Sequence, residues 1–319
     1  MIRKIIIARH YGFCMGVKRA IKIADETAGK AGGPVTILNE IVHNDAVVED
    51  FRNKGVGQEF AVSDVASGTL IISAHGVAPG VKQAARDKGL TVIDATCPLV
   101  THIYKIIAKV IPQGYYLIHF GDSNHDETQG VVGHAPDRIT VISSIAQLDN
   151  YPEWKDRKLG LTVQTTMRIE DFEAFRLAAE KKWPQLETFD TICMATTERQ
   201  TAIRDIAPEV DIILVVGSQT SANSKRLANI SQALCGRGEL IGSADDIRAD
   251  WFTAAGEAIE RVGVTAGAST PDFLVEAVIE RLKQISGGQA EVVRQPKPEK
   301  KRPAVPAAIS NAAPSAEVR

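Results

Sequence analysis

The sequence predicts an α/β protein of three similar lobes with mainly parallel sheets around a central site, followed by a disordered C-terminal tail. Over the first 285 or so residues, short apolar strand-like segments alternate with amphipathic helical segments. That alternation is typical of parallel sheets covered on both faces. Three cysteines recur at the same place in the alternation, where a strand turns into a helix: Cys14, Cys97 and Cys193. Their even spacing predicts one cysteine per lobe.

Each strand is predicted from a β-branched run that ends in a polar or glycine-containing turn, and each helix from apolar residues that return every three or four positions. The predicted strands are, in chain order, 4–8, 69–73, 91–94, 115–120, 158–163, 211–216 and 261–265. The predicted helices are 17–27, 81–88, 100–110, 169–181, 199–206, 225–234 and 273–285. We assign 14–96 to lobe one, 97–192 to lobe two, and 193–285 together with 1–13 to lobe three.

The tail is predicted from its composition. Residues 286–319 hold five of the 14 prolines and continue into a sequence rich in alanine, proline and serine. Such a segment has too few apolar residues to build a core. We therefore expect the whole of 286–319 to be disordered.

Composition narrows the class of protein. The formal net charge is −2, with 44% hydrophobic and 24% charged residues. These values exclude a fibrous or wholly disordered chain and offer no field for binding nucleic acid. The longest apolar run, 212–216, is far shorter than the roughly 20 residues that span a bilayer. We expect a cytoplasmic protein without membrane segments, as a monomer or homodimer.

The four cysteines include no C-x-x-C pair, which disfavours zinc-ribbon and thioredoxin-type sites. A thiol at a helix N-terminus is expected to favour its thiolate form, which suits metal ligation or nucleophilic chemistry. Cys235 differs, because it ends a predicted helix just before Gly236. We interpret it as a small core residue.

Polar residues gather at the predicted strand ends. His43, His75 and His125 lie in such turns, and the C-terminal half supplies hydroxyls and amides at 164–166, 221–224 and 265–271. Small donors at helix N-termini bind phosphate oxygens, so these turns favour a phosphorylated ligand. Glu127, two residues after His125, is the best candidate proton donor, and the Thr165 hydroxyl is a candidate relay. No G-x-G-x-x-G or P-loop motif is present, which disfavours nicotinamide, flavin and nucleotide cofactors.

Eight short motifs, in order, resemble one family. They are Gly-Phe-Cys-Met-Gly-Val (12–17), Ile-Val-His-Asn (41–44), Ser-Ala-His-Gly-Val (73–77), Asp-Ala-Thr-Cys-Pro-Leu-Val (94–100), Gln-Thr-Thr (164–166), Ile-Cys-Met-Ala-Thr-Thr (192–197), Ser-Ala-Asn-Ser (221–224) and Gly-Val-Thr-Ala-Gly-Ala-Ser (263–269). Together they resemble the 4-hydroxy-3-methylbut-2-enyl diphosphate reductases, the last enzymes of the methylerythritol phosphate route to isoprenoids. The resemblance covers about residues 3–285.

The resemblance implies a [4Fe–4S] cluster bound by the three cysteines, with one iron left open for the substrate hydroxyl. It implies two-electron, two-proton reductive dehydroxylation to isopentenyl and dimethylallyl diphosphates. The electrons would come from ferredoxin or flavodoxin. The implied catalytic residues are Glu127 and Thr165. The implied substrate-binding residues are His43, His75, His125, Thr165, Ser221, Asn223 and Ser269.

The sequence also departs from the usual pattern of that family. Ala222 replaces a second serine, Asp126 a proline, Asn124 a glycine, Glu198 an asparagine and Met194 a tyrosine. Two other interpretations are therefore kept. One is a metal hydrolase of phosphorylated substrates that binds zinc or manganese through the three histidines of the strand-end turns. The other is a divergent paralogue that acts as an iron–sulfur redox sensor or phosphoester-binding protein.

Overall fold

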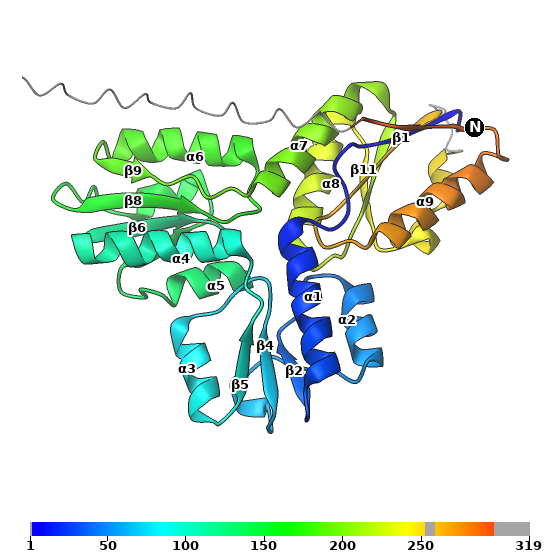
Figure 1. Ribbon diagram of the computed structural model, residues 1–319. Coiled ribbons are helices and arrows are strands. Elements are labelled where there is room, and N and C mark those ends of the chain that lie inside the picture. The colour runs from blue at the N-terminus through cyan, green and yellow to red at the C-terminus, as the bar shows by residue number, and fades with distance from the viewer. Residues whose placement is uncertain (1, 253–258, 297–319) are drawn as a thin grey trace, which may run out of the picture.

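The computed structural model describes residues 2–252 and 259–296. In this part of the chain three parallel sheets, each flanked by helices, form three lobes around a common centre (Figure 1). The fold class predicted from the sequence is therefore confirmed. Short 3-10 helices connect the main elements at Val62–Asp64, Ile111–Gln113, Ile145–Asn150, Ala207–Glu209, Ala244–Asp246 and Ala249–Phe252.

The first lobe has a four-stranded sheet in the order β3-β2-β4-β5. Its strands are β2 (Val35–Leu38), β3 (Gly57–Glu59), β4 (Thr69–Ile72) and β5 (Thr91–Asp94), and its helices are α1 (Met15–Lys30), α2 (Asp45–Asn53) and α3 (Pro79–Asp87). Neighbouring residues of β4 face opposite ways: Ile71 packs in the cluster under α1 and α2, whereas Leu70 and Ile72 pack in the cluster on the other face. Both faces of this sheet are thus buried, as its unbroken apolar strands predict.

The second lobe has the sheet order β7-β6-β8-β9. Its strands are β6 (Tyr115–Phe120), β7 (Ile139–Ile142), β8 (Lys158–Val163) and β9 (Leu186–Thr188), and its helices are α4 (Pro98–Val110), α5 (Asp126–Val132) and α6 (Ile169–Lys182). Trp183, completely buried after α6, packs with Phe172 and Phe175 against one face, while Ile103 and Ile107 of α4 pack against the other.

The third lobe joins the two ends of the described chain in one five-stranded sheet, in the order β11-β10-β12-β1-β13. Its strands are β1 (Lys4–Ile7), β10 (Ile212–Val216), β11 (Gly238–Ile241), β12 (Arg261–Ala266) and β13 (Glu291–Arg294), and its helices are α7 (Met194–Ile206), α8 (Ala222–Cys235) and α9 (Asp272–Ile285). Strand β1 pairs in parallel with both β12 and β13. The exact limits predicted for the three lobes stay a prediction.

The predicted tail begins too early. Residues 286–296 belong to the described structure, and β13 adds an edge strand to the third sheet. Gly287 and Gly288, both with positive φ, reverse the chain after α9. Val292 then packs on the core, and Arg294 pairs with Glu276 at 2.7 Å. The proline-rich remainder of the predicted tail, 297–319, lies outside the described residues.

The predicted helices all occur, but those that follow the cysteines start earlier than the apolar periodicity indicates. Helices α1 and α7 begin at the residue directly after a cysteine, and α4 begins at Pro98. The short strands β2, β3, β7, β9 and β11 were not predicted, because they are only three or four residues long and all but β2 lie at sheet edges. Across residues 2–252 and 259–296, no helix combines the length and the apolar character needed to cross a membrane.

Candidate active site

The three cysteines of the strand–turn–helix pattern are helix N-caps. Cys14, Cys97 and Cys193 are the N-cap residues of α1, α4 and α7. The Cys14 sulfur accepts the backbone N–H of Val17 at 3.4 Å, and the Cys193 sulfur accepts that of Thr196 at 3.3 Å. In these two helices a sulfur takes the place of the usual N-cap oxygen, so the local fold fixes where the thiols of Cys14 and Cys193 point.

Backbone hydrogen bonds tie each cysteine to a strand-end turn. The amide of Cys97 donates to the carbonyl of Ala74 at 2.9 Å, and that of Cys193 to the carbonyl of Thr165 at 3.0 Å. The amide of Cys14 donates to the carbonyl of Ala268, in the turn after β12, at 3.0 Å. The cysteines therefore lie directly beside the turns that carry the predicted polar residues.

Gly16 shows how closely two of the thiols approach. A Cβ atom at this glycine would lie 2.5 Å from the Cys97 sulfur and 3.9 Å from the Cys14 sulfur. Thiols from α1 and α4 thus share one small volume that only a glycine leaves open. Cys14 is close enough to Cys193 to affect its pKa electrostatically. Glu127 is close enough to affect the pKa of both Cys97 and Cys193.

The expectation that all three cysteines favour the thiolate form is wrong for two of them. Burial raises the pKa of the Cys97 and Cys193 thiols, and this effect outweighs the backbone N–H groups of α4 and α7 that lower it. Both are therefore neutral thiols in the protein alone. A metal that binds them has to displace their protons.

Arg199 is a buried cation between two cysteine turns, and the sequence analysis did not identify it. Its side chain is 4% exposed and donates to the carbonyl of Ala195 at 2.9 Å and to the carbonyl of Gly12. Its Nε atom is buried without a hydrogen-bond partner. Burial lowers its pKa, while Cys14 and Cys193 act in the opposite direction. Because burying an unpaired charge costs free energy, negative charge nearby would stabilise this guanidinium.

The three predicted histidines form one cluster. The rings of His43 and His75 stack with their centroids 4.0 Å apart, and the His125 ring meets them edge-on at 5.4 and 5.7 Å. The Nδ1 atom of His43 lies 2.7 Å from a carboxylate oxygen of Glu40. Burial lowers the pKa of His75 far below its usual value and that of His125 to about 4. Both rings are therefore neutral at pH 7 and can donate and accept hydrogen bonds.

Glu127 and Thr165 form a buried pair. One Glu127 oxygen accepts the backbone N–H of Thr165 at 2.7 Å, and the other lies 2.6 Å from the Thr165 hydroxyl. Glu127 is 2% exposed, and burial raises the pKa of its carboxyl despite the hydrogen bonds from Thr165 and the nearby Arg226, which lower it. The structure therefore brings together the two residues whose proximity the sequence could not establish.

Of the remaining predicted residues, Ser269 contacts the histidine cluster, and Ser221 and Asn223 lie at the start of α8, whose first residues line the pocket next to it. Ser269 donates its hydroxyl hydrogen bond to the His43 carbonyl at 2.9 Å. Ser221 caps α8 by accepting the N–H of Ser224 at 3.3 Å. Asn223 is 5% exposed, and its side-chain nitrogen has no partner among the described residues. A buried amide left free in this way is typical of a ligand site.

A pocket of about 380 Å³ opens onto this cluster, lined by His43, His125, Asp126, Ala222, Lys225 and Arg226, among others. Two cations and the N-terminus of the 14-residue helix α8 therefore face it. Ala222 contributes no hydroxyl. Glu198 points toward His10 instead, at 3.6 Å.

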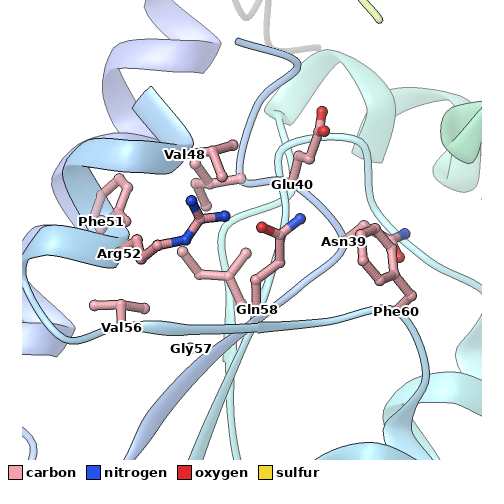
Figure 2. A pocket seen from close by; sticks show the side chains of 11 residues that line it. Asn39, Glu40, Val48, Phe51, Arg52, Val56, Gly57, Gln58 and Phe60 are labelled. Carbon is pink, nitrogen blue, oxygen red and sulfur yellow. The ribbon is translucent and has the colours of Figure 1, made fainter. Parts of the chain in front are cut away.

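A second pocket, of about 350 Å³, lies between α2 and β3 (Figure 2). It is lined by Phe51, Arg52, Gln58 and Phe60, and Glu40 is the one lining residue that also contacts the histidine cluster. None of the cysteines lines it.

Glu40, Arg199 and Arg226 were not predicted as parts of the site. The only local signals are that Glu40 precedes His43 by three residues and that Arg199 lies on the first turns of the helix capped by Cys193. Neither spacing distinguishes a site residue from a surface one.

Comparisons with known proteins agree with this arrangement. A family model described as LytB protein matches residues 5–283. A 4-hydroxy-3-methylbut-2-enyl diphosphate reductase of Methylibium petroleiphilum is 38% identical over 307 residues, which cover 93% of this chain and 92% of the relative. The enzyme of the same name from Escherichia coli O1:K1 is 38% identical over 295 residues, which cover 90% and 92%.

Solved structures give the same result. The E-1-hydroxy-2-methyl-but-2-enyl-4-diphosphate reductase of Plasmodium falciparum superposes with a TM-score of 0.86 at 29% identity, over 92% of this chain and 93% of that one. A second structure, titled as (E)-4-hydroxy-3-methyl-but-2-enyl diphosphate reductase, gives a TM-score of 0.64 at 34% identity, over 89% and 100%. The chain belongs to the LytB family of 4-hydroxy-3-methylbut-2-enyl diphosphate reductases.

Proposed function

We propose that this protein reduces 4-hydroxy-3-methylbut-2-enyl diphosphate to isopentenyl and dimethylallyl diphosphates, with a [4Fe–4S] cluster held by Cys14, Cys97 and Cys193. The observation that carries the proposal is the convergence of three helix-capping cysteines beside a buried carboxyl group and a cluster of three histidines. Relatives of the same name match along almost the whole chain, which supports the same reaction.

The donor set fits an iron–sulfur cluster. The soft thiols of Cys14 and Cys97 approach one small volume that Gly16 leaves open, and Cys193 lies within electrostatic range of Cys14. Arg199 supports the same conclusion, since a thiolate-bound cluster would add negative charge beside a buried guanidinium whose Nε has no hydrogen-bond partner. When bound, such a cluster supplies electrons and a Lewis-acidic iron with an open position for the hydroxyl oxygen.

The polar turns would hold the diphosphate. His43, His75 and His125 offer ring N–H groups, and Asn223 offers the unpartnered amide described above. Ser221, Ser269 and Thr165 add hydroxyls around the same turns. The N-terminus of α8 and the side chains of Lys225 and Arg226 supply positive potential for an anion.

Glu127 is the proposed proton donor, with Thr165 as the relay. Hydroxide is a poor leaving group, so C–O cleavage needs a proton on the departing oxygen. The raised pKa of the Glu127 carboxyl keeps more of it protonated than an exposed glutamate would be. The Thr165 hydroxyl, 2.6 Å from that carboxyl, can pass the proton on and be reprotonated from it.

An external one-electron donor, ferredoxin or flavodoxin, would dock near the cysteines. Each cysteine is followed within two residues by an exposed apolar side chain: Met15 is 87% exposed, Met194 70% and Leu99 44%. Since these three side chains flank the three cysteines, they would together offer an apolar contact surface to a partner protein.

An anaerobic preparation tests the proposal. We expect about four iron and four sulfide ions per chain, a broad visible absorption, and turnover of the hydroxylated allylic diphosphate with a reduced one-electron donor. A cluster-free protein after careful reconstitution would refute the proposed cofactor. A full cluster without turnover would favour the redox sensor instead.

A further inference from the structure

We propose that His43, His75 and Asp126 form a binding site for one divalent transition-metal cation, with Zn²⁺ as the fitting ion. The site is separate from the three cysteines, and zinc binding at it does not require the proposed reaction, although its test rests on the proposed cluster, which occupies the cysteines. It uses a carboxylate that no step of the proposed reaction requires.

The three side chains already converge. One ligand atom from each of them lies within 4.8 Å of the other two. The Nδ1 atom of His75 is 4.0 Å from an Asp126 carboxylate oxygen. Ligands of a tetrahedral zinc ion lie roughly 3.3–3.6 Å apart, given bonds of about 2.0–2.2 Å. Side-chain shifts of about 1 Å would bring the ligand atoms to that spacing. One imidazole would also have to turn out of the stack of His43 and His75, because a zinc ion lies in the ring plane of each histidine that binds it.

Glu40 orients one of the ligands. Its carboxylate lies 2.7 Å from Nδ1 of His43, which keeps the proton on that nitrogen and leaves the Nε2 lone pair free. A carboxylate behind a ligating histidine is the usual outer partner in zinc sites, where it fixes the tautomer and makes the ligand more basic. Glu40 also balances part of the charge of the cation.

The donor set selects the kind of cation. Two imidazoles and one carboxylate form the protein ligands of many catalytic zinc sites. Magnesium and calcium prefer oxygen ligands alone and fit this set poorly. The pocket of about 380 Å³ reaches both His43 and Asp126, so a hydrated ion has a path to the site. Asp122 in the pocket wall attracts a cation, whereas Lys225 and Arg226 oppose it.

The site has a consequence for turnover, and this part rests on the proposed function. The same two imidazoles would bind either the metal or the diphosphate. Zinc and the substrate are therefore expected to exclude each other, so that zinc inhibits the reductase competitively.

The test uses the holoenzyme, because its cluster occupies the cysteine sulfurs that would otherwise bind zinc. Zinc alone is added, and X-ray absorption at the zinc edge reads its ligands. We expect one ion per chain, with nitrogen and oxygen ligands at about 2.0–2.2 Å. Sulfur ligands at about 2.3 Å would overturn the assignment, because they place zinc at the cysteines.

Two charge-matched variants locate the site. Asp126→Asn is expected to weaken zinc binding at least tenfold, whereas Asp122→Asn, which removes the same charge from the same pocket, should change it by less than about twofold. Equal losses in both variants would show general electrostatic attraction and overturn the proposal. Turnover measured with a chelator present tests the proposed function separately, so either idea can fail alone.

Discussion

Replacing Gly16 with alanine should damage the cysteine site even though alanine is the better helix former. The added Cβ would lie 2.5 Å from the Cys97 sulfur, whereas non-bonded atoms prefer separations of about 3.5–4.0 Å. The sulfur must therefore move by about 1 Å. Metal–ligand distances tolerate only about 0.2 Å, so we expect most of the iron and acid-labile sulfide to be lost after reconstitution.

Gly29, in the last turns of the same helix, provides the matched control. It is exposed, and an added Cβ would have no atom within 4 Å. Gly29→Ala should raise the free energy of unfolding by up to about 1 kcal/mol and leave the cluster intact. In Gly16→Ala, overpacking costs about 1–3 kcal/mol, which outweighs the gain in helix propensity. The free energy of unfolding should therefore fall by about 1 kcal/mol. Full iron and sulfide in Gly16→Ala, with stability raised as in the control, would refute the reasoning.

Three further variants probe other parts of the protein. Glu127→Gln should keep the cluster and lower kcat by about 10²–10⁴-fold, and wild-type turnover should fall as the pH rises through the raised pKa of this carboxyl; full activity in the variant would contradict its role as proton donor. His119 is completely buried and its pKa is lowered to about 3, below the unfolded value of about 6.5, so its contribution to stability is full above pH 6.5 and is lost as the pH falls. Between pH 7.5 and 5.5, chemical denaturation should show wild type losing about 1.4 kcal/mol more than His119→Gln; parallel curves would show that the histidine does not titrate in this way. Met194→Glu should raise the KM for the protein electron donor but not for a small chemical reductant, while Leu177→Glu, on the exposed face of α6, should change neither; an unchanged KM in the first variant would place the donor elsewhere.

The fold class could be predicted because strand and helix patterns are local. The apolar run of β10 and the heptad-like spacing in α4 appear directly in the sequence. Strands such as β3, with the sequence Gly-Gln-Glu, carry no such pattern, because edge position and hydrogen bonds to β2 alone make them strands. Strand β13 was missed for a similar reason, since it depends on a pairing with residues at the other end of the chain.

The site was predictable where a motif marks it and not where burial decides. The three cysteines and the histidine turns are visible as strand-end residues. The partnership of Glu127 with Thr165 joins positions 38 residues apart, and only the packing of β6 beside β8 brings them together. Burial likewise decides that Cys97 and Cys193 are protonated in the protein alone, which no sequence pattern shows.

The place of β1 in the third sheet sets an order of events during synthesis. The strands of the first two lobes come from continuous stretches of chain, so those lobes can fold as they leave the ribosome. Strand β1, by contrast, can pair only after β12 and β13 have been synthesised. The Cys14 amide likewise can donate to the carbonyl of Ala268 only after that residue has been synthesised. At ~5–20 residues per second, the roughly 250 residues in between take about 13–50 s to be made. The N-terminal segment therefore stays unpaired until the strands of the third lobe have been made, and only then is Cys14 held beside the turn that follows β12.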